Sequence, residues 1–191
     1  IGGTGDALDY TKRSILAGKS VVSSNKELVA VHGHEILKLA RERNLNYLFE
    51  ASVGGGIPIL RPISQCLAAN EINEVYGILN GTTNYILSQM IQNKISFEEA
   101  LNGARENGYA EANPAADIKG IDTCRKVCIL AALSFGRHIS PEQVVTRGID
   151  DVTEEDIAYA ESLGAGIKLV GRAIRSENGR IAAYVAPHIV P

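Results

Sequence analysis

The stretch YAEANPAADIKGIDTCRK, residues 109–126, places charged and turn-forming residues between two apolar segments. Pro114 disfavours helical backbone for the residue before it, and Gly120 permits a turn. We therefore expect Glu111 and Asp117 to lie on a structured loop.

A helix is expected directly after this loop. Apolar positions recur at helical spacing from Val127 to a stop signal at Gly136. Asp122 and Lys126 should therefore lie one turn apart on the first part of this helix. A functional interpretation is that the loop carboxylates and the helix ammonium converge on a small polar substrate, because a lysine held against carboxylates can transfer a proton while its charge is balanced.

Simpler roles stay open for the same residues. Asp122 can act as an N-cap, because an aspartate before a helix accepts hydrogen bonds from backbone N–H groups. With Lys126 it can instead form a surface pair at i,i+4 spacing, which contributes only about 0.3 kcal/mol. Glu111 and Asp117 can be solvated loop charges. Taken singly, none of the four residues requires catalysis.

Composition bounds the class of protein. A chain of 191 residues is enough for one domain with a core, or for one domain and part of another. The net charge of −3 gives no sign of a surface for nucleic acid or membrane. No apolar run is long enough to cross a bilayer, and the N-terminus lacks a basic region followed by a hydrophobic one. We expect a cytoplasmic protein that binds neither nucleic acid nor a membrane.

The cysteines and histidines do not form a metal-binding pattern. Cys66, Cys124 and Cys128 cannot all pair, and the last two are one turn apart on the predicted helix rather than in a Cys-x-x-Cys motif. We interpret them as small apolar side chains in a reducing compartment. His32 and His34 are two positions apart on a predicted helix and point in different directions, so a zinc site is not expected.

The first part of the chain has the pattern of an α/β unit. Residues 6–17 favour a helix that ends at Gly18, and residues 20–23 form a short apolar strand. The chain opens at Ile1 without a methionine, so we expect an excised piece that begins in the tail of such a unit. No Gly-x-Gly-x-x-Gly follows any strand, so a complete nucleotide-binding half is not expected.

Lys26 follows the strand 20–23 at the start of a long amphipathic helix. Ligands of open α/β sheets bind at the carboxyl ends of the strands, where Lys26 is expected. The alternative is a surface charge at the helix start.

A glycine loop follows the next predicted strand, residues 47–53, which carries Glu50 in an apolar setting. The three glycines 54–56 allow backbone carbonyls to turn inward. One carboxylate with inward carbonyls is the oxygen-rich environment that hard cations favour. A loop that only lets two elements pack closely is the alternative.

Further elements follow in order. The predicted strand 71–79 leads into the turn Asn80–Tyr85 and a helix, where hydroxyls, amides and free N–H groups favour a carboxylate or phosphate. Capping and turn signals then predict a helix from Ser96 to Glu106, a helix over 154–163, and a hairpin of strands 167–175 and 180–186.

Four segments together resemble homoserine dehydrogenase, in the order that this family has them. They are SSNKELVA at 23–30, EASVGGGIPI at 50–59, GILNGTTNYIL at 77–87 and GYAEANPAADIKGIDTCRKVCILA at 108–131. The resemblance implies an α/β (α+β) fold with a mixed β-sheet covered by helices. It also implies that residues 1–25 are the remnant of an N-terminal dinucleotide-binding Rossmann domain, and that residues 26–191 form the substrate-binding, catalytic and dimerisation domain.

The resemblance further implies an activity. Members of this family reversibly reduce L-aspartate 4-semialdehyde to L-homoserine with NADPH or NADH, in the pathway to threonine, methionine and isoleucine, and the resemblance implies a homodimer. The family's Gly-rich cofactor region and the segment that returns to the nucleotide domain have no counterpart here. We therefore expect the isolated chain to lack cofactor binding and activity.

Site residues follow from the same match. Lys126 matches the family's catalytic lysine, the expected proton donor to the substrate carbonyl oxygen. Lys26 matches a lysine near the nicotinamide end of the cofactor that is also proposed to bind substrate or relay a proton. Glu111 matches the residue that holds the substrate amino group, and Asp117 and Asp122 match carboxylates of the same pocket.

A monovalent cation site, usually for sodium, is also implied. Glu50 matches it by its side chain, and Val53, Gly55 and Ile57 match it by their carbonyls. One departure is Asn113, because many relatives have an aspartate before this proline. The loop thereby loses a charge, and Asn113 is left out of the expected site.

Two other readings stay open beside this one. In isolation the chain is a non-catalytic dimerisation module, or the protein is a dehydrogenase of similar architecture for another small aldehyde. The NGTTNY turn with Glu111 and Lys126 argues against another aldehyde, because this combination matches the family specifically.

Overall fold

The computed structural model describes all 191 residues and groups them into two compact units. The first unit comprises Ile1–Val75, Arg125–Gln143 and Arg175–Arg180, and the second comprises Tyr76–Cys124, Val144–Ile174 and Ile181–Pro191. The predicted domain boundary after residue 25 is a different division, and it stays a prediction.

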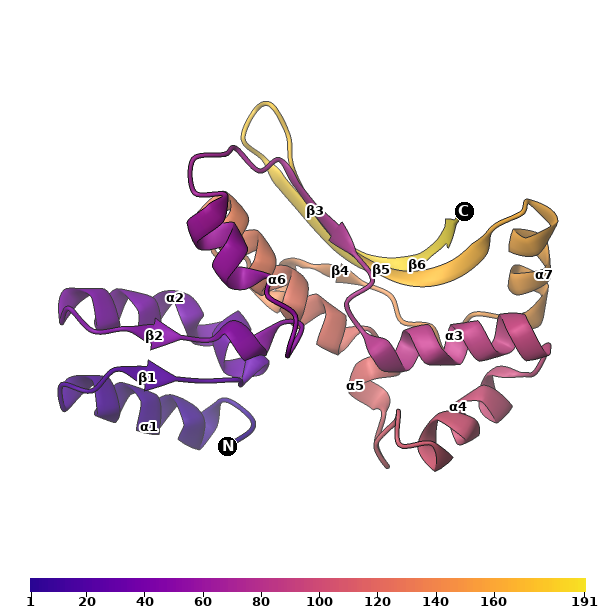
Figure 1. Ribbon diagram of the computed structural model, residues 1–191, viewed down its shortest axis with the longest axis horizontal. Helices are drawn as coiled ribbons and strands as arrows, with labels where there is room; N and C mark the ends of the chain where they lie inside the picture. Colours follow the sequence, from indigo (N-terminus) through magenta and orange to yellow (C-terminus); the bar gives the residue numbers. More distant parts are fainter. The chain divides into compact units, whose positions relative to one another are not determined.

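The first unit begins with a small α/β arrangement, as predicted. Its elements are α1 (Gly5–Leu16), β1 (Val21–Val22), α2 (Lys26–Glu42) and β2 (Tyr47–Leu48). The two strands pair in parallel, and α1 packs against α2 and β1 (Figure 1). The periodic apolar positions of both helices supply the core, since Ile15, Leu28 and Ile36 are fully buried.

The predicted strand 47–53 is wrong in its second half. β2 ends at Leu48, and Glu50–Ser52 form a 3-10 helix (η1). The side chain of Glu50 turns back to the backbone of residues 59–61, so this segment cannot continue as a strand. Gly54 and Gly56 then take positive φ values of 60° and 82°, which reverse the chain. A π-helical turn, Pro62–Cys66 (η2), follows.

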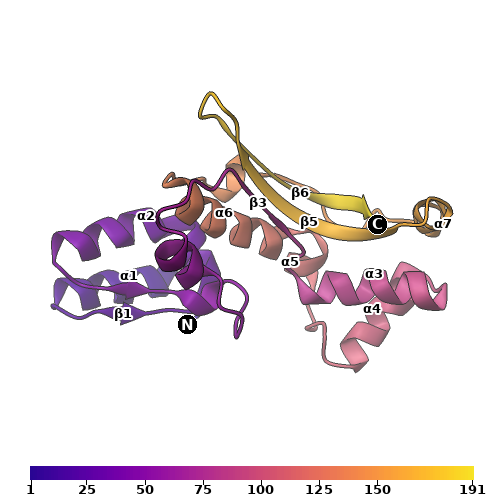
Figure 2. The same cartoon turned by 45° about the horizontal axis from the view of Figure 1, so that its top comes forward.

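The remainder of the chain contains a four-stranded sheet, in which the strands lie in the order β3-β5-β6-β4. Its strands are β3 (Glu74–Gly77), β4 (Val145–Thr146), β5 (Gly166–Arg175) and β6 (Ile181–Val190). β5 and β6 form the predicted hairpin, and Figure 2 shows them as a long curved ribbon. β4 pairs in parallel with β6. The sheet is therefore mixed, as the resemblance implied.

Five helices accompany this sheet in the chain. They are α3 (Gly81–Asn93), α4 (Phe97–Glu106), α5 (Ala115–Ile118), α6 (Ile121–Phe135) and α7 (Glu154–Ser162), with a 3-10 turn at Pro141–Gln143 (η3). α3 packs against α4, α5 and α7. Ser96 forms the predicted capping box of α4 with Glu99, and Thr153 forms one with Asp156 at α7. No helix is long and apolar enough to cross a bilayer.

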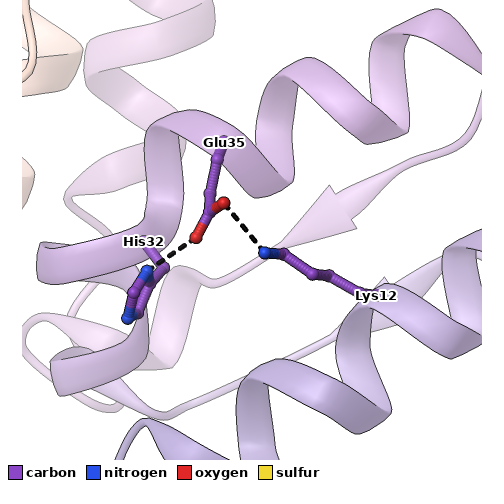
Figure 3. A network of polar contacts seen from close by, with 3 residues as sticks. All are labelled: Lys12, His32 and Glu35. Carbon is purple, nitrogen blue, oxygen red and sulfur yellow. Dashed lines mark hydrogen bonds and ion pairs between the residues drawn. The ribbon is translucent and has the colours of Figure 1, made fainter.

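An ion-pair network joins α1 to α2 in the first unit (Figure 3). The carboxylate of Glu35 bonds the Nζ of Lys12 at 2.9 Å and the Nδ1 of His32 at 2.6 Å. The hydrogen bond from Lys12, aided by that from His32, holds the pKa of Glu35 below its ordinary value. The contacts with Lys12 and His32 therefore stabilise the ionised form of Glu35 in the folded protein.

This network predicts a pH-dependent contribution to stability. Because the folded pKa of Glu35 is lowered, the contribution is present above the unfolded value of 4.5 and is lost as pH falls through the folded value. Glu35→Gln should lower the free energy of unfolding at pH 7 by less than about 1 kcal/mol, since the pair is partly exposed. Urea unfolding at pH 7 and pH 3 measures this. The same substitution at exposed Glu42 on α2 is the control, and an equal difference at both pH values would contradict the prediction.

Candidate active site

A buried polar cluster in the second unit joins three helices at Asn80. The side-chain oxygen of Asn80 accepts the N–H of Thr83 at 2.8 Å and thereby caps α3. Its Nδ2 donates to Oδ1 of Asp117 at 2.7 Å and to Oδ2 of Asp122 at 2.9 Å. Asn80 and Asp122 are only 5% and 6% exposed. The starts of α3 and α6 and the short α5 are thus tied together through one amide.

The simpler roles considered for Asp122 do not hold. α6 begins at Ile121, so Asp122 lies in the first helical turn and is not the residue before the helix. Its burial also excludes a solvated surface pair with Lys126. The prediction that Asp117 lies on a loop is wrong, because Pro114 starts the short helix α5, which carries it.

The remaining side chains of the NGTTNY turn are engaged within the second unit. The Thr82 hydroxyl donates to the carbonyl of Tyr109 at 2.7 Å, and the ring of Tyr85 stacks on that of Tyr109 with centroids 4.4 Å apart. The side-chain oxygen of Asn84 accepts a hydrogen bond of 2.8 Å from the Nζ of Lys168. The groups that we expected to receive an anion therefore brace the turn against α4, β5 and the loop after α4.

Lys168 is a partly buried cation of this brace. Its Nζ donates to Asn84 and also to the Ser88 hydroxyl at 2.9 Å, two neutral acceptors on α3. Burial lowers the pKa of Lys168 below its ordinary value. The contact fixes α3 on β5 close to the turn.

Close backbone packing holds the turn between α5 and α6. The N–H of Ile149 donates to the carbonyl of Ile118 at 2.7 Å. Gly148 passes so near that a Cβ there would lie 2.6 Å from the Cα of Lys119 and still closer to the Ile118 carbonyl oxygen. The turn that joins α5, which carries Asp117, to α6, which carries Asp122, is therefore held by the backbone of residues 148 and 149.

The two predicted lysines lie on helices of the first unit. Lys26 is the first residue of α2, directly after the cap Asn25, and Lys126 follows Asp122 by one turn of α6. Both are half-buried. Their neighbours Glu27 and Arg125 form an ion pair of 2.7 Å, which holds the start of α2 against this part of α6. Sequence reasoning missed this pair, because the two residues are 98 positions apart.

Glu111 and Glu50 have different surroundings. Glu111 is exposed on the loop between α4 and α5. Glu50 follows β2, and its carboxylate accepts three backbone N–H bonds, at 3.0 Å from Ile59, 3.1 Å from Leu60 and 2.8 Å from Arg61. Glu50 and Lys26 thus both follow carboxyl ends of the parallel strands of the first unit.

The proposed cation donors can be compared with this geometry. None of the backbone hydrogen bonds of the turns and loops ends on the carbonyls of Val53, Gly55 and Ile57, which makes these three oxygens candidate donors. Glu50 has already engaged both carboxylate oxygens, although each keeps acceptor capacity. The set fits a monovalent cation in donor chemistry. No group of three or more His, Cys, Asp or Glu side chains is placed to hold a metal ion.

Comparison with known proteins gives this architecture a family. The model of the homoserine dehydrogenase family matches residues 58–191. Homoserine dehydrogenase of Bacillus subtilis (strain 168) is 42% identical over 191 residues, which cover 100% of this chain and 44% of that protein. That of Pseudomonas aeruginosa is 44% identical, with the same coverage. The chain therefore spans about 44% of the length of these curated relatives.

Solved structures agree. The crystal structure of a homoserine dehydrogenase from Thiobacillus denitrificans superposes with a TM-score of 0.96 at 45% identity, covering 100% of this chain and 44% of that one. A hyperthermophilic archaeal homoserine dehydrogenase in complex with NADPH gives 0.82 at 29% identity, covering 97% and 53%. On the match to residues 58–191 and these relatives, the chain belongs to the homoserine dehydrogenase family.

Proposed function

We propose that the protein containing this chain is a homoserine dehydrogenase that interconverts L-homoserine and L-aspartate 4-semialdehyde with NAD or NADP. The observation that carries the proposal is the pair of half-buried Asp117 and buried Asp122, joined by Asn80, with Lys126 one turn beyond Asp122 on α6. The relatives of the same family support it. Action in the cytoplasm, as a homodimer, in the synthesis of threonine, methionine and isoleucine belongs to the same proposal.

The charges of the substrate and of the three carboxylates suggest how the substrate binds. Homoserine carries an ammonium group, which Glu111, Asp117 and Asp122 attract as carboxylates. Asp122 is buried and Asp117 half-buried, so their charges are screened less by water than that of exposed Glu111. We therefore expect the two aspartates to contribute more to orientation, and Glu111 to close on the substrate from the loop.

Lys126 is the proposed acid. In the reducing direction bound nicotinamide would supply a hydride to the aldehyde carbon. Negative charge then grows on the carbonyl oxygen, and the Lys126 ammonium stabilises it and donates the proton that completes the alcohol. In the oxidising direction the neutral amine of Lys126 accepts this proton from the hydroxyl group.

Lys26 is proposed to lie near the nicotinamide end of the cofactor and to help bind substrate or relay a proton. Its place after the carboxyl end of β1 supports this, because open parallel sheets bind dinucleotides at that edge. A sodium ion on the carbonyls of Val53, Gly55 and Ile57, with Glu50, would stabilise the loop after β2 at the same edge.

Oxidation of L-homoserine tests the proposal. NAD⁺ and NADP⁺ are supplied in parallel to the full-length protein and to the chain of residues 1–191, and reduced nicotinamide is followed by absorbance. We expect turnover by the full-length protein, and none by the chain alone. A folded full-length protein that does not oxidise homoserine would refute the proposal and would direct a screen to other small aldehydes. Dimerisation of an inactive chain would identify it as an assembly module in isolation.

A further inference from the structure

Two of the proposed pocket carboxylates share one neutral donor. The Nδ2 of Asn80 bonds Asp117 and Asp122, which lie 37 and 42 positions further along the chain on α5 and α6. Two carboxylates that converge on one point repel each other, and an NH₂ group with two hydrogens can satisfy both. Each carboxylate uses one oxygen for its bond to Asn80.

Capping of α3 does not explain why this residue is asparagine. Asparagine, aspartate and serine cap helices about equally well, since each offers an oxygen to the backbone. At residue 80 the oxygen faces the N–H of Thr83 and therefore the NH₂ end must face the carboxylates. Only an amide has an acceptor at one end and two donor hydrogens at the other.

We infer that Asn80 is a positioning residue of the proposed substrate pocket. Its buried amide sets the separation and direction of Asp117 and Asp122, so that both carboxylates reach the substrate ammonium as one unit. The inference rests on the proposed function. It adds Asn80 to the residues of the proposed pocket, with a side chain that contacts the two carboxylates rather than the substrate.

Substitutions that keep the cap separate positioning from capping. Asn80→Ser and Asn80→Asp both retain an oxygen for Thr83, but neither retains the two-hydrogen donor. We expect kcat/KM for homoserine oxidation by the full-length protein to fall about 10²-fold in both, the loss typical of a misplacement of about 1 Å. Asn93→Asp is the control, because it makes the same change at an exposed residue near the end of α3. It should keep kcat/KM within about twofold.

The pH dependence tests whether residue 80 lies against both carboxylates, and the pH profile of kcat/KM tests whether this contact matters for homoserine. Asn80→Asp brings a third carboxylate to the pair, so one of the three takes up a proton. The loss of kcat/KM should therefore be smaller at pH 6 than at pH 9, whereas Asn80→Ser should show a loss of equal size at both. By the same linkage the unfolding temperature of Asn80→Asp, relative to the unsubstituted protein, should fall as pH rises from 5.5 to 8.

Retention of at least half the kcat/KM by both variants, with an unchanged pH profile, would overturn the inference. If the unsubstituted protein does not oxidise homoserine, the proposed function fails. The unfolding temperatures can be measured without enzyme activity, so they test the bridging role of Asn80 separately from the proposed function. An effect of Asn80→Asp on the unfolding temperature that does not depend on pH refutes the bridging role, and an effect that depends on pH supports it.

Discussion

Lys126→Met should lower kcat for homoserine oxidation by about 10³-fold, within the range of 10²–10⁴ that the loss of a placed acid or base causes. Methionine keeps the length and most of the apolar stem of lysine, so α6 should retain its packing while the ammonium is lost. Lys126 is half-buried and follows the buried Asp122 by one turn of α6.

Steady-state kinetics of the full-length protein distinguish proton transfer from binding. Lys126→Arg keeps the positive charge, but a guanidinium does not give up its proton at these pH values. We therefore expect Lys126→Arg to keep KM closer to the original value than kcat. Lys38→Met, at an exposed position of α2, makes the matched change and should leave turnover unaltered. If Lys126→Met kept more than about a tenth of the original kcat, Lys126 would not be the acid.

The longer helices could be predicted from sequence because their signals are local, whereas the four-residue α5 was expected to be a loop. Apolar periodicity predicted α2 and α6, the capping box at Ser96 predicted the start of α4 within one position, and the helix predicted to follow Thr153 is α7. The β5–β6 hairpin was equally local, since its turn chemistry lies within a few residues. Such signals depend on neighbours in the chain, which the sequence displays directly.

The candidate site could be predicted only in part. Resemblance supplied Lys126, Asp117 and Asp122, but not the amide that joins the aspartates, because hydrogen bonds over 37 and 42 positions leave no periodic trace. The strand predicted around Glu50 failed for the same reason. Its carboxylate is engaged by backbone N–H groups nine to eleven positions later, and this tertiary contact outweighs the apolar pattern of the segment.

Gly148→Ala should clearly lower the stability of the second unit. The new Cβ would lie 2.6 Å from the Cα of Lys119 and closer still to the carbonyl oxygen of Ile118, both backbone atoms that cannot rotate away. The turn between α5 and α6 must therefore move, and the 2.7 Å bond from Ile149 to Ile118 is stretched or lost. Overpacking of this kind costs about 1–3 kcal/mol, to which a lost hydrogen bond adds about 1 kcal/mol.

The displaced turn joins the helices that carry Asp117 and Asp122, so the same substitution should also reduce kcat/KM for homoserine by about 10²-fold if the backbone shifts by about 1 Å. Gly103→Ala on α4 is the matched control, because its Cβ would meet only the Tyr85 hydroxyl at 3.9 Å. Alanine there should leave kcat/KM unchanged and raise the free energy of unfolding by about 0.5–1 kcal/mol through helix propensity. Urea unfolding and homoserine kinetics of both variants measure the two effects. A Gly148→Ala protein as stable and as active as the original would show that the contact between Gly148 and Ile118 does not fix the proposed pocket.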